Sequence, residues 1–236
     1  MLAIYKREMR SYFTSPIGFI FVAIFLAANS ALFAVATLRA GENSSTASYF
    51  TMLLFELVIV LPILTMKQFS EERKLKTEQL LLTAPVSLTS MVLAKYFAAY
   101  TMFGGTFLIS SLNLLILSIY TDGLSGGVIF GCIFAILLIS GAFLAVGLFI
   151  SSLTENQLVA AIATIASLAL LVLISMANNS IGNYVIRTVL NWLSVYSRFS
   201  YFTSGIFDFS ALLYYASFIF VFLFLTVRVF EKRRWA

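Results

Sequence analysis

One charged stretch interrupts an otherwise apolar chain: Met66–Ser87, which reads MKQFSEERKLKTEQLLLTAPVS. Seven of the chain's 25 formally charged residues lie between Lys67 and Glu78, and a short leucine-rich segment that ends at Pro85 follows them. Strongly apolar runs flank the stretch on both sides. Because charged side chains are costly inside a bilayer, the stretch predicts a connection that leaves the membrane between two spans.

The composition of the whole chain is that of an integral membrane protein. Hydrophobic residues make up 61% of its 236 positions and charged residues 11%, and the mean hydropathy is +1.00. Soluble domains average about 45–50% apolar and about 25% charged residues. The apolar runs are about 20 residues long and lack the alternation of barrel strands, so we expect an all-α fold. Six spans are predicted, at Ile17–Leu38, Phe50–Met66, Met91–Tyr120, Val128–Ile150, Leu158–Ala177 and Ala211–Val229.

The residue types that the chain lacks exclude several classes of enzyme. Without histidine, Ser-His-Asp catalysis, Cys-His catalysis and His-ligated zinc are ruled out. Cys132 is the sole cysteine, which excludes disulfide frameworks and cysteine metal clusters. An intramembrane enzyme would need paired acids, but Glu56 is the sole carboxylate well inside a predicted span. We therefore expect no enzymatic activity and no metal or cofactor bound by this chain.

The distribution of basic residues predicts the orientation. Twelve of the fifteen Lys and Arg residues fall on one side of the six predicted spans, together with both termini. The positive-inside rule makes that side cytoplasmic, which explains the basic charge without any binding of nucleic acid. The twelve are Lys6, Arg7, Arg10, Lys67, Arg73, Lys74, Lys76, Lys95, Arg228, Lys232, Arg233 and Arg234.

The first sixteen residues have the pattern of an amphipathic helix. Basic side chains occupy one face, and apolar side chains recur on the other at helical spacing. We expect residues 1–16 to lie at the membrane interface with the apolar face in the lipid, ending at Pro16; a plain juxtamembrane anchor is the alternative. The apolar residues are Leu2, Tyr5, Met9, Tyr12 and Phe13.

Residues 178–210, on the extracytoplasmic side, are unusually aromatic for an outer connection. Trp and Tyr favour the membrane interface, so we expect one or two short helices there. They could gate an outward opening or simply anchor the bundle as an aromatic belt. The candidate gate residues are Trp192, Tyr196, Phe199 and Phe202.

Polar residues inside the predicted spans are candidates for a transport pathway. A charged residue at the bilayer centre costs at least about 2.5–3.5 kcal/mol on insertion scales, so Glu56 should face the bundle interior, a cavity or a partner. A protonated glutamate near the outer interface, hydrogen-bonded to a neighbour, is the alternative. Asn29 and Asn113 could line the same cavity, or could make ordinary hydrogen bonds between helices.

Within the charged stretch, the pattern predicts a short cytoplasmic helix. Ser70 can cap it, and Glu71 and Glu72 suit the positive end of the helix dipole. Pro85 ends the leucine-rich turn that follows. Leucines outside the lipid normally need a protein groove, and burying one fully is worth about 1.5–3 kcal/mol. Leu80–Leu82 therefore predict docking onto a cytoplasmic partner.

These motifs resemble the coupling-helix region of ABC-2-type transporter permeases, in particular the gliding-motility and copper-processing branch. The resemblance follows the order and spacing of nearly the whole chain. Family members commonly carry glycine where this chain has Lys76, and often histidine near Arg198. The motifs are Thr65-Met66-Lys67, Glu71-Glu72-Arg73, Thr77–Ser87, Lys95-Tyr96, Leu193-Ser194, Ser197-Arg198-Phe199, Gly205–Asp208, Tyr214-Tyr215 and Glu231–Trp235.

The resemblance implies a single permease domain over residues 1–236, in the cytoplasmic membrane of a prokaryote. It implies export driven by a separate ATP-binding subunit, and pairing with a second permease subunit of the same or a different kind. An additional extracytoplasmic subunit is a further candidate partner. ATP and magnesium would bind to the ATP-binding subunit, since none of the twelve glycines here is followed by the lysine of a P-loop.

The ATP-binding subunit would dock on residues 67–87. The implied coupling residues are Phe69, Glu71, Glu72, Arg73, Thr77, Glu78, Leu80, Leu81, Leu82 and Pro85. Glu155, in the turn between the fourth and fifth spans, is a candidate second contact or a simple solvated residue. Two other functions remain as alternatives: a non-transporting scaffold of an ABC-type machine, and a secondary transporter that uses Glu56.

Overall fold

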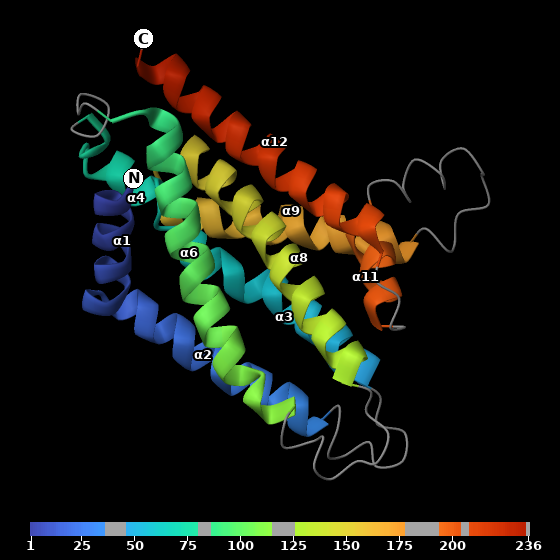
Figure 1. Cartoon of the computed structure of the whole chain (residues 1–236). Helices are drawn as coiled ribbons and strands as arrows, with labels where there is room; N and C mark the ends of the chain where they lie inside the picture. Colours follow the sequence, from blue (N-terminus) through green and yellow to red (C-terminus); the bar gives the residue numbers. More distant parts are fainter. Residues whose placement is uncertain (36–45, 80–85, 115–125, 178–193, 204–207, 235–236) are drawn as a thin grey trace.

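A computed structural model describes residues 1–35, 46–79, 86–114, 126–177, 194–203 and 208–234. Within these ranges the secondary structure is helical and contains no strand (Figure 1), which confirms the all-α prediction. The helices are α1 (Leu2–Thr14), α2 (Pro16–Phe33), α3 (Thr46–Thr65), α4 (Ser70–Lys74), α6 (Leu88–Ser110), α8 (Gly126–Leu153), α9 (Gln157–Ala177), α11 (Val195–Thr203) and α12 (Phe209–Arg234).

Six helical stretches of the described residues are long and apolar enough to cross a membrane, so the chain is a multi-pass membrane protein by the length and composition of its helices. Each overlaps one predicted span. The last continues beyond the predicted end at Val229 into the basic residues before Arg234. The six are Pro16–Phe33, Ser48–Lys74, Leu88–Leu114, Gly127–Leu153, Gln157–Ile174 and Phe209–Arg234.

The centre of the bundle is α8, which packs against α3, α6, α9 and α12. Its side chains Ile136, Ile139 and Phe143 are buried. The outer helices expose apolar side chains instead, such as Ile162 on α9 (67% exposed) and Phe220 on α12 (70% exposed). Such an apolar outer face would be unfavourable in water and suits a hydrocarbon environment.

A tight elbow joins α1 to α2. Ser15 is extended, and Pro16 begins α2, where its missing amide hydrogen costs nothing. Gly18 permits the close approach of the two helices, because a Cβ atom there would lie 2.1 Å from the backbone oxygen of Tyr12. The helix α1 thus ends at Thr14, two residues before the predicted end at Pro16.

The apolar face of α1 is divided between the bundle and the exterior. Tyr12 is buried, and the Tyr5 hydroxyl donates to Thr101 Oγ1 on α6 (3.2 Å). Leu2 and Phe13 are exposed. The expectation that this whole face lies in lipid is therefore wrong for Tyr12, because helical spacing identifies an apolar face but not whether lipid or protein covers it.

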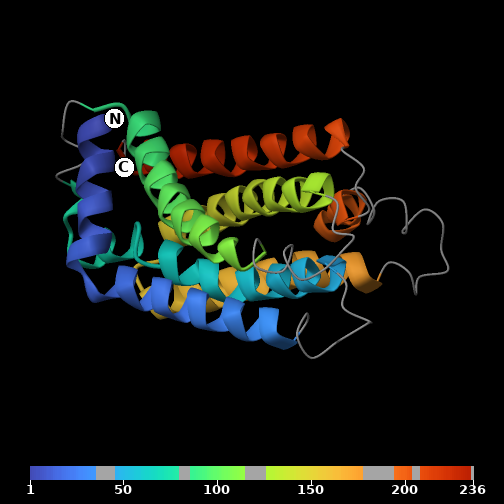
Figure 2. The ribbon, with the colours of Figure 1, turned by 60° about the horizontal axis from the view of Figure 1, so that its bottom comes forward.

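Polar contacts gather at one end of the bundle, where α1, α4, the start of α6 and the ends of α8 and α12 meet (Figures 1 and 2). The N-terminus and the C-terminal end of α12 both lie at this end (Figure 2). The short helix α11 lies at the other end, where the Cys132 thiol of α8 donates to the Phe202 backbone oxygen (3.7 Å).

Candidate functional site

The candidate site is the connection between α3 and α6, at the polar end of the bundle. Its first residues, Met66–Ser70, which we call the base, are fixed to α8 through Ser151. The amides of Phe69 and Ser70 donate to Ser151 Oγ (3.2 and 3.3 Å), and Ser151 Oγ donates to the Met66 backbone oxygen (3.3 Å). The Phe69 ring is buried against Phe230 of α12, with centroids 4.7 Å apart.

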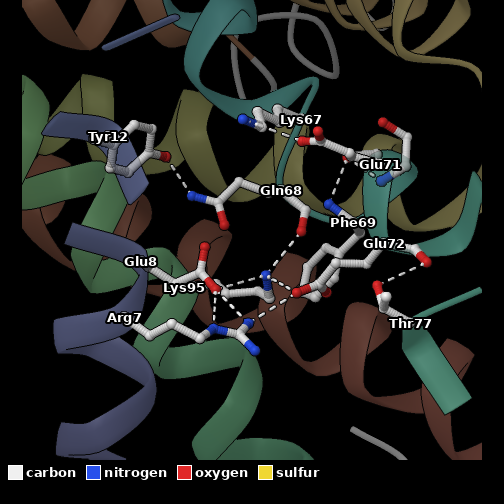
Figure 3. Close-up of polar contacts among 12 residues, drawn as sticks. Arg7, Glu8, Tyr12, Lys67, Gln68, Phe69, Glu71, Glu72, Thr77 and Lys95 are labelled. Carbon is white, nitrogen blue, oxygen red and sulfur yellow. Dashed lines mark hydrogen bonds and ion pairs between the residues drawn. The ribbon is translucent and has the colours of Figure 1, made fainter. Parts of the chain in front are cut away.

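Lys95 of α6 joins the base to α1 (Figure 3). Its side chain is 1% exposed, and its ammonium group makes three hydrogen bonds: to Glu8 Oε1 (3.1 Å), Glu72 Oε1 (2.9 Å) and the Gln68 backbone oxygen (2.9 Å). The Nζ atom also lies 5.2 Å from the centre of the Phe69 ring. All three donors of the ammonium group are thus used, as a buried lysine requires.

Arg7 completes a balanced group of charges with Glu8, Glu72 and Lys95. Its Nη2 donates to Glu8 Oε1 (2.5 Å) and to Glu72 Oε1 (2.8 Å). We call these four residues the ion-pair network. Burial alone would raise the pKa of Glu8, but Lys95 and Arg7 hold that pKa below its ordinary value. Two cations and two carboxylates therefore stabilise one another where α1, α4 and α6 meet.

Tyr12 and Gln68 extend this polar contact toward the membrane spans. The Gln68 amide donates to the Tyr12 hydroxyl, which in turn donates to the Leu64 backbone oxygen (3.4 Å). Burial raises the pKa of Tyr12. A cavity of about 470 Å³ lies between α1 and the connection, and the side-chain oxygen of Gln68, one of its lining residues, has no hydrogen-bond partner among the described residues.

Two arginines tie the connection to α8 and α12. Arg73 donates from Nη1 to the Leu153 backbone oxygen (3.0 Å) and pairs through Nε with Glu155 (2.9 Å). Arg233 of α12 pairs with Glu78 (3.1 Å) and donates to the Ser152 backbone oxygen (2.5 Å). The basic end of α12 is thus part of the site, and Glu155 contacts the connection itself.

The helix α4 ends in a left-handed turn at Lys76. The Thr77 amide donates to the Glu72 backbone oxygen (2.9 Å), and the Lys76 amide donates to the Arg73 backbone oxygen (3.1 Å). Lys76 has φ +57°. This is the Schellman pattern, in which glycine is the usual residue at the left-handed position. Lys76 therefore occupies the position of the turn at which glycine would be free of strain.

The predicted N-cap of α4 is wrong. Phe69 occupies the cap position without a side-chain hydrogen bond, and Ser70 is the first residue of the helix. The Ser70 hydroxyl donates instead to the Met66 backbone oxygen, because the chain enters α4 in a tight turn that leaves this acceptor close by. The expected acidic residues, Glu71 and Glu72, do lie in the first turn.

The far part of the connection faces outward. Lys74–Thr77, which we call the tip, is exposed, and Leu75 is 63% exposed. Sequence reasoning missed Leu75, whose signal was an isolated leucine among charged residues. Among the expected coupling residues, Phe69 is buried and Thr77 is exposed. Glu71 pairs with Lys67 (3.3 Å). The remaining three are half-buried and form ion pairs: Glu72, Arg73 and Glu78. Leu80, Leu81, Leu82 and Pro85 lie outside the described residues.

The three polar residues predicted for a pathway have different surroundings. Asn29 is fully buried, and its side-chain oxygen accepts hydrogen bonds from Tyr49 (2.9 Å) and Ser110, which link α2, α3 and α6. Glu56 is buried beside a groove between α2 and α3 that neither Asn29 nor Asn113 lines. Asn113 is half-buried and lies three residues beyond the end of α6. The structure therefore does not bring the three together in one cavity.

The expected short helix on the other side of the bundle is present as α11. Phe199 and Phe202 are buried, and Tyr196 is half-buried, where α11 packs against α8 and α9. The Tyr215 hydroxyl of α12 donates to the Val195 backbone oxygen (2.8 Å) and holds the start of the helix. Trp192 lies outside the described residues.

Comparison with models of known protein families gave no match to this chain, and no curated protein matches it either. The described residues contain no group of three or more Cys, Asp or Glu side chains that could hold a metal ion. The connection is bound through its base to α1, α6, α8 and α12, and its tip is exposed.

Proposed function

We propose that the chain is the permease subunit of an ABC-2-type exporter, and that its connection between α3 and α6 receives a separate ATP-binding subunit. The family motifs quoted above support this proposal. The observation that carries it is the asymmetry of the connection, whose base is buried among α1, α6, α8 and α12 while its tip is exposed. An exposed leucine beside charged residues suits a helix-in-groove contact.

The contacts of α4 and of Glu78 explain how movement of the tip would reach the membrane. A displacement of α4 shifts Glu72, which is held by Lys95 of α6 and Arg7 of α1. It also shifts Arg73 and Glu78, which are held at the ends of α8 and α12. Closely packed elements transmit such strain because they resist compression. Closure of paired ATP-binding subunits would therefore move several spans together.

This proposal includes the orientation and the partners. The polar end faces the cytoplasm of a prokaryote, since the basic residues gather there, and α1 lies at that membrane interface. A second permease subunit completes the pathway. The segment 178–210 is extracytoplasmic, and there α11, with Phe199 and Phe202, forms part of an outer gate that an additional subunit could contact.

Co-purification tests the proposed docking. The tagged chain, solubilised in a mild detergent, should bring down a P-loop ATPase. Replacing Leu75 and Leu80–Leu82 with aspartate should abolish that association, because charged side chains cannot fill an apolar groove. The matched control is Lys232→Gln, an exposed change near the end of α12, which should leave the association intact. Normal association by the aspartate variant would contradict the proposal.

A secondary transporter is the second candidate, because Glu56 is a buried carboxyl group without a hydrogen-bond partner among the described residues. Transport into membrane vesicles separates the two candidates. The proposed exporter requires ATP and continues when the proton gradient is dissipated. A secondary transporter stops when the gradient is dissipated and does not respond to ATP.

A further inference from the structure

A groove of about 490 Å³ lies between α2 and α3. Its walls are apolar and include Leu32 of α2 together with Met52, Phe55 and Ile59 of α3. Those three residues of α3 are exposed, so the groove opens on the outer surface of the bundle. Because both helices are long and apolar enough to cross a membrane, a lipid-soluble molecule could reach the groove directly from the bilayer.

Glu56 is the polar residue among those that line this groove. Its side chain is buried, with 7% of the residue exposed. The Asn29 side chain lies close to this carboxyl group, and its nitrogen, like both Glu56 oxygens, has no hydrogen-bond partner within 3.5 Å among the described residues. Even if Asn29 donates one hydrogen bond, the groove combines apolar walls with a carboxyl group that has further acceptor capacity.

The position of Glu56 along α3 makes the ionised form of its carboxyl group costly without a ligand. It lies near the middle of Thr46–Thr65, about 15 Å from either end at 1.5 Å per residue. That depth corresponds to the centre of a hydrocarbon layer about 30 Å thick. Intramembrane ionisable residues normally face a partner, an ion or a substrate.

We propose that this groove binds a lipid-soluble amine, whose protonated amino group donates to Glu56 and whose apolar body lies along Leu32, Phe55 and Ile59. In the ionised form that a bound cation stabilises, the Glu56 carboxylate can only accept hydrogen bonds, so the ligand must supply donors. A cation also cancels the charge, and the attraction is strong in a medium of low dielectric constant. A neutral alcohol supplies a donor but leaves the charge uncompensated, and an anionic lipid is repelled.

This site does not depend on the proposed ATP-binding partner, because α2 and α3 of one chain form the groove. Binding can therefore be measured on the purified full-length chain alone. A failure to bind the amine would leave the docking proposal untouched, and a failure of docking would leave this site untouched.

The test uses the full chain in phosphatidylcholine nanodiscs, with n-dodecylamine as the probe and n-dodecanol and dodecanoate as matched neutral and anionic compounds. Binding is measured by native mass spectrometry and by the shift in Tm. The wild type should bind the amine about tenfold more tightly than the alcohol, as a charge-assisted hydrogen bond predicts. Glu56→Gln should remove that preference while circular dichroism shows an unchanged helix content.

Two further variants test the walls of the groove. Ala31→Trp should fill it from α2, which would weaken binding of both the amine and the alcohol while Glu56 stays in place. Leu170→Trp, on the exposed face of α9, is the control and should leave the binding of both compounds unchanged.

Three results would overturn the proposal. The first is equal affinity of the wild type for the amine and the alcohol. The second is unchanged amine affinity in Glu56→Gln. The third is a wild-type dimer that Ala31→Trp dissociates in light-scattering measurements, because a second copy of the chain would then occupy the groove.

Discussion

Lys76 shows how one residue can oppose the local structure it occupies. The left-handed conformation at the end of α4 costs a residue with a Cβ atom about 1–2 kcal/mol and costs glycine almost nothing. The turn persists because its two backbone hydrogen bonds and the fixed base of the connection hold it in place. The strain lies within the exposed tip, so it bears on the conformation that the tip offers to a partner.

We predict that Lys76→Gly stabilises the protein. Relief of the strain should outweigh the greater freedom of glycine in the unfolded chain, for a net gain of about 0.5–1 kcal/mol. Lys74→Gly is the matched control: Lys74 belongs to α4, so glycine there should cost about 1 kcal/mol. Thermal unfolding in detergent measures both variants. A loss of stability in both would contradict the left-handed turn at Lys76.

At the scale of elements, the ion-pair network holds α1 against α4 and α6. Lys95 and Glu8 are separated by 87 positions in the sequence. Arg7 pairs with the same two carboxylates as Lys95, those of Glu8 and Glu72. The charges of the network balance, and the Lys95 ammonium group is fully hydrogen-bonded. Removing one member leaves one buried charge of the network uncompensated, which costs far more than an exposed ion pair is worth.

We therefore predict that Lys95→Met destabilises the protein by about 3–5 kcal/mol, because Glu8 and Glu72 lose their buried cation. Lys6→Met, an exposed change on α1, should stay within about 0.5 kcal/mol. Denaturant titration measures both. Adding Glu8→Gln to Lys95→Met should recover part of the loss, since Arg7 and Glu72 then remain as one balanced ion pair; a further loss would argue against the network.

At the scale of the whole molecule, the stability of the bundle should depend on pH through Glu8. The pKa of this carboxyl group is lower in the folded protein than in the unfolded chain, because Lys95 and Arg7 outweigh the effect of its burial. The stability that the ionised Glu8 carboxyl group contributes is therefore fully present above its pKa in the unfolded chain, about 4.3. The contribution is lost as the pH falls through the lower folded pKa.

Measurements of Tm between about pH 3 and pH 7 test this dependence. The wild type should lose stability on acidification more steeply than Glu8→Gln, which cannot take up a proton at this position. Above about pH 5 the difference in Tm between the two proteins should be constant. Parallel curves over the whole range would show that Glu8 is not held by Lys95 and Arg7.

The topology explains why these contacts meet. The connection between α3 and α6, the turn between α8 and α9, and the outer ends of α1 and α12 reach the same end of the bundle (Figure 1). Residues from four other parts of the sequence, namely α1, α6, the end of α8 with the turn after it, and α12, therefore surround the connection that carries α4. A force on the tip of the connection would therefore reach several helices of the bundle, as the proposed function requires.

The local pattern of the amino-acid sequence determined the all-helical fold, the six apolar helices and the charged connection, because hydropathy and helical periodicity are properties of neighbouring residues. The same pattern could not choose the partners of single side chains. Only the tertiary structure turned Phe69 inward, paired Lys95 with Glu8, and placed Glu56 beside an open groove. The physical reason is that a buried charge or ring takes the partner that packing brings to it, and packing joins residues that are far apart in the chain.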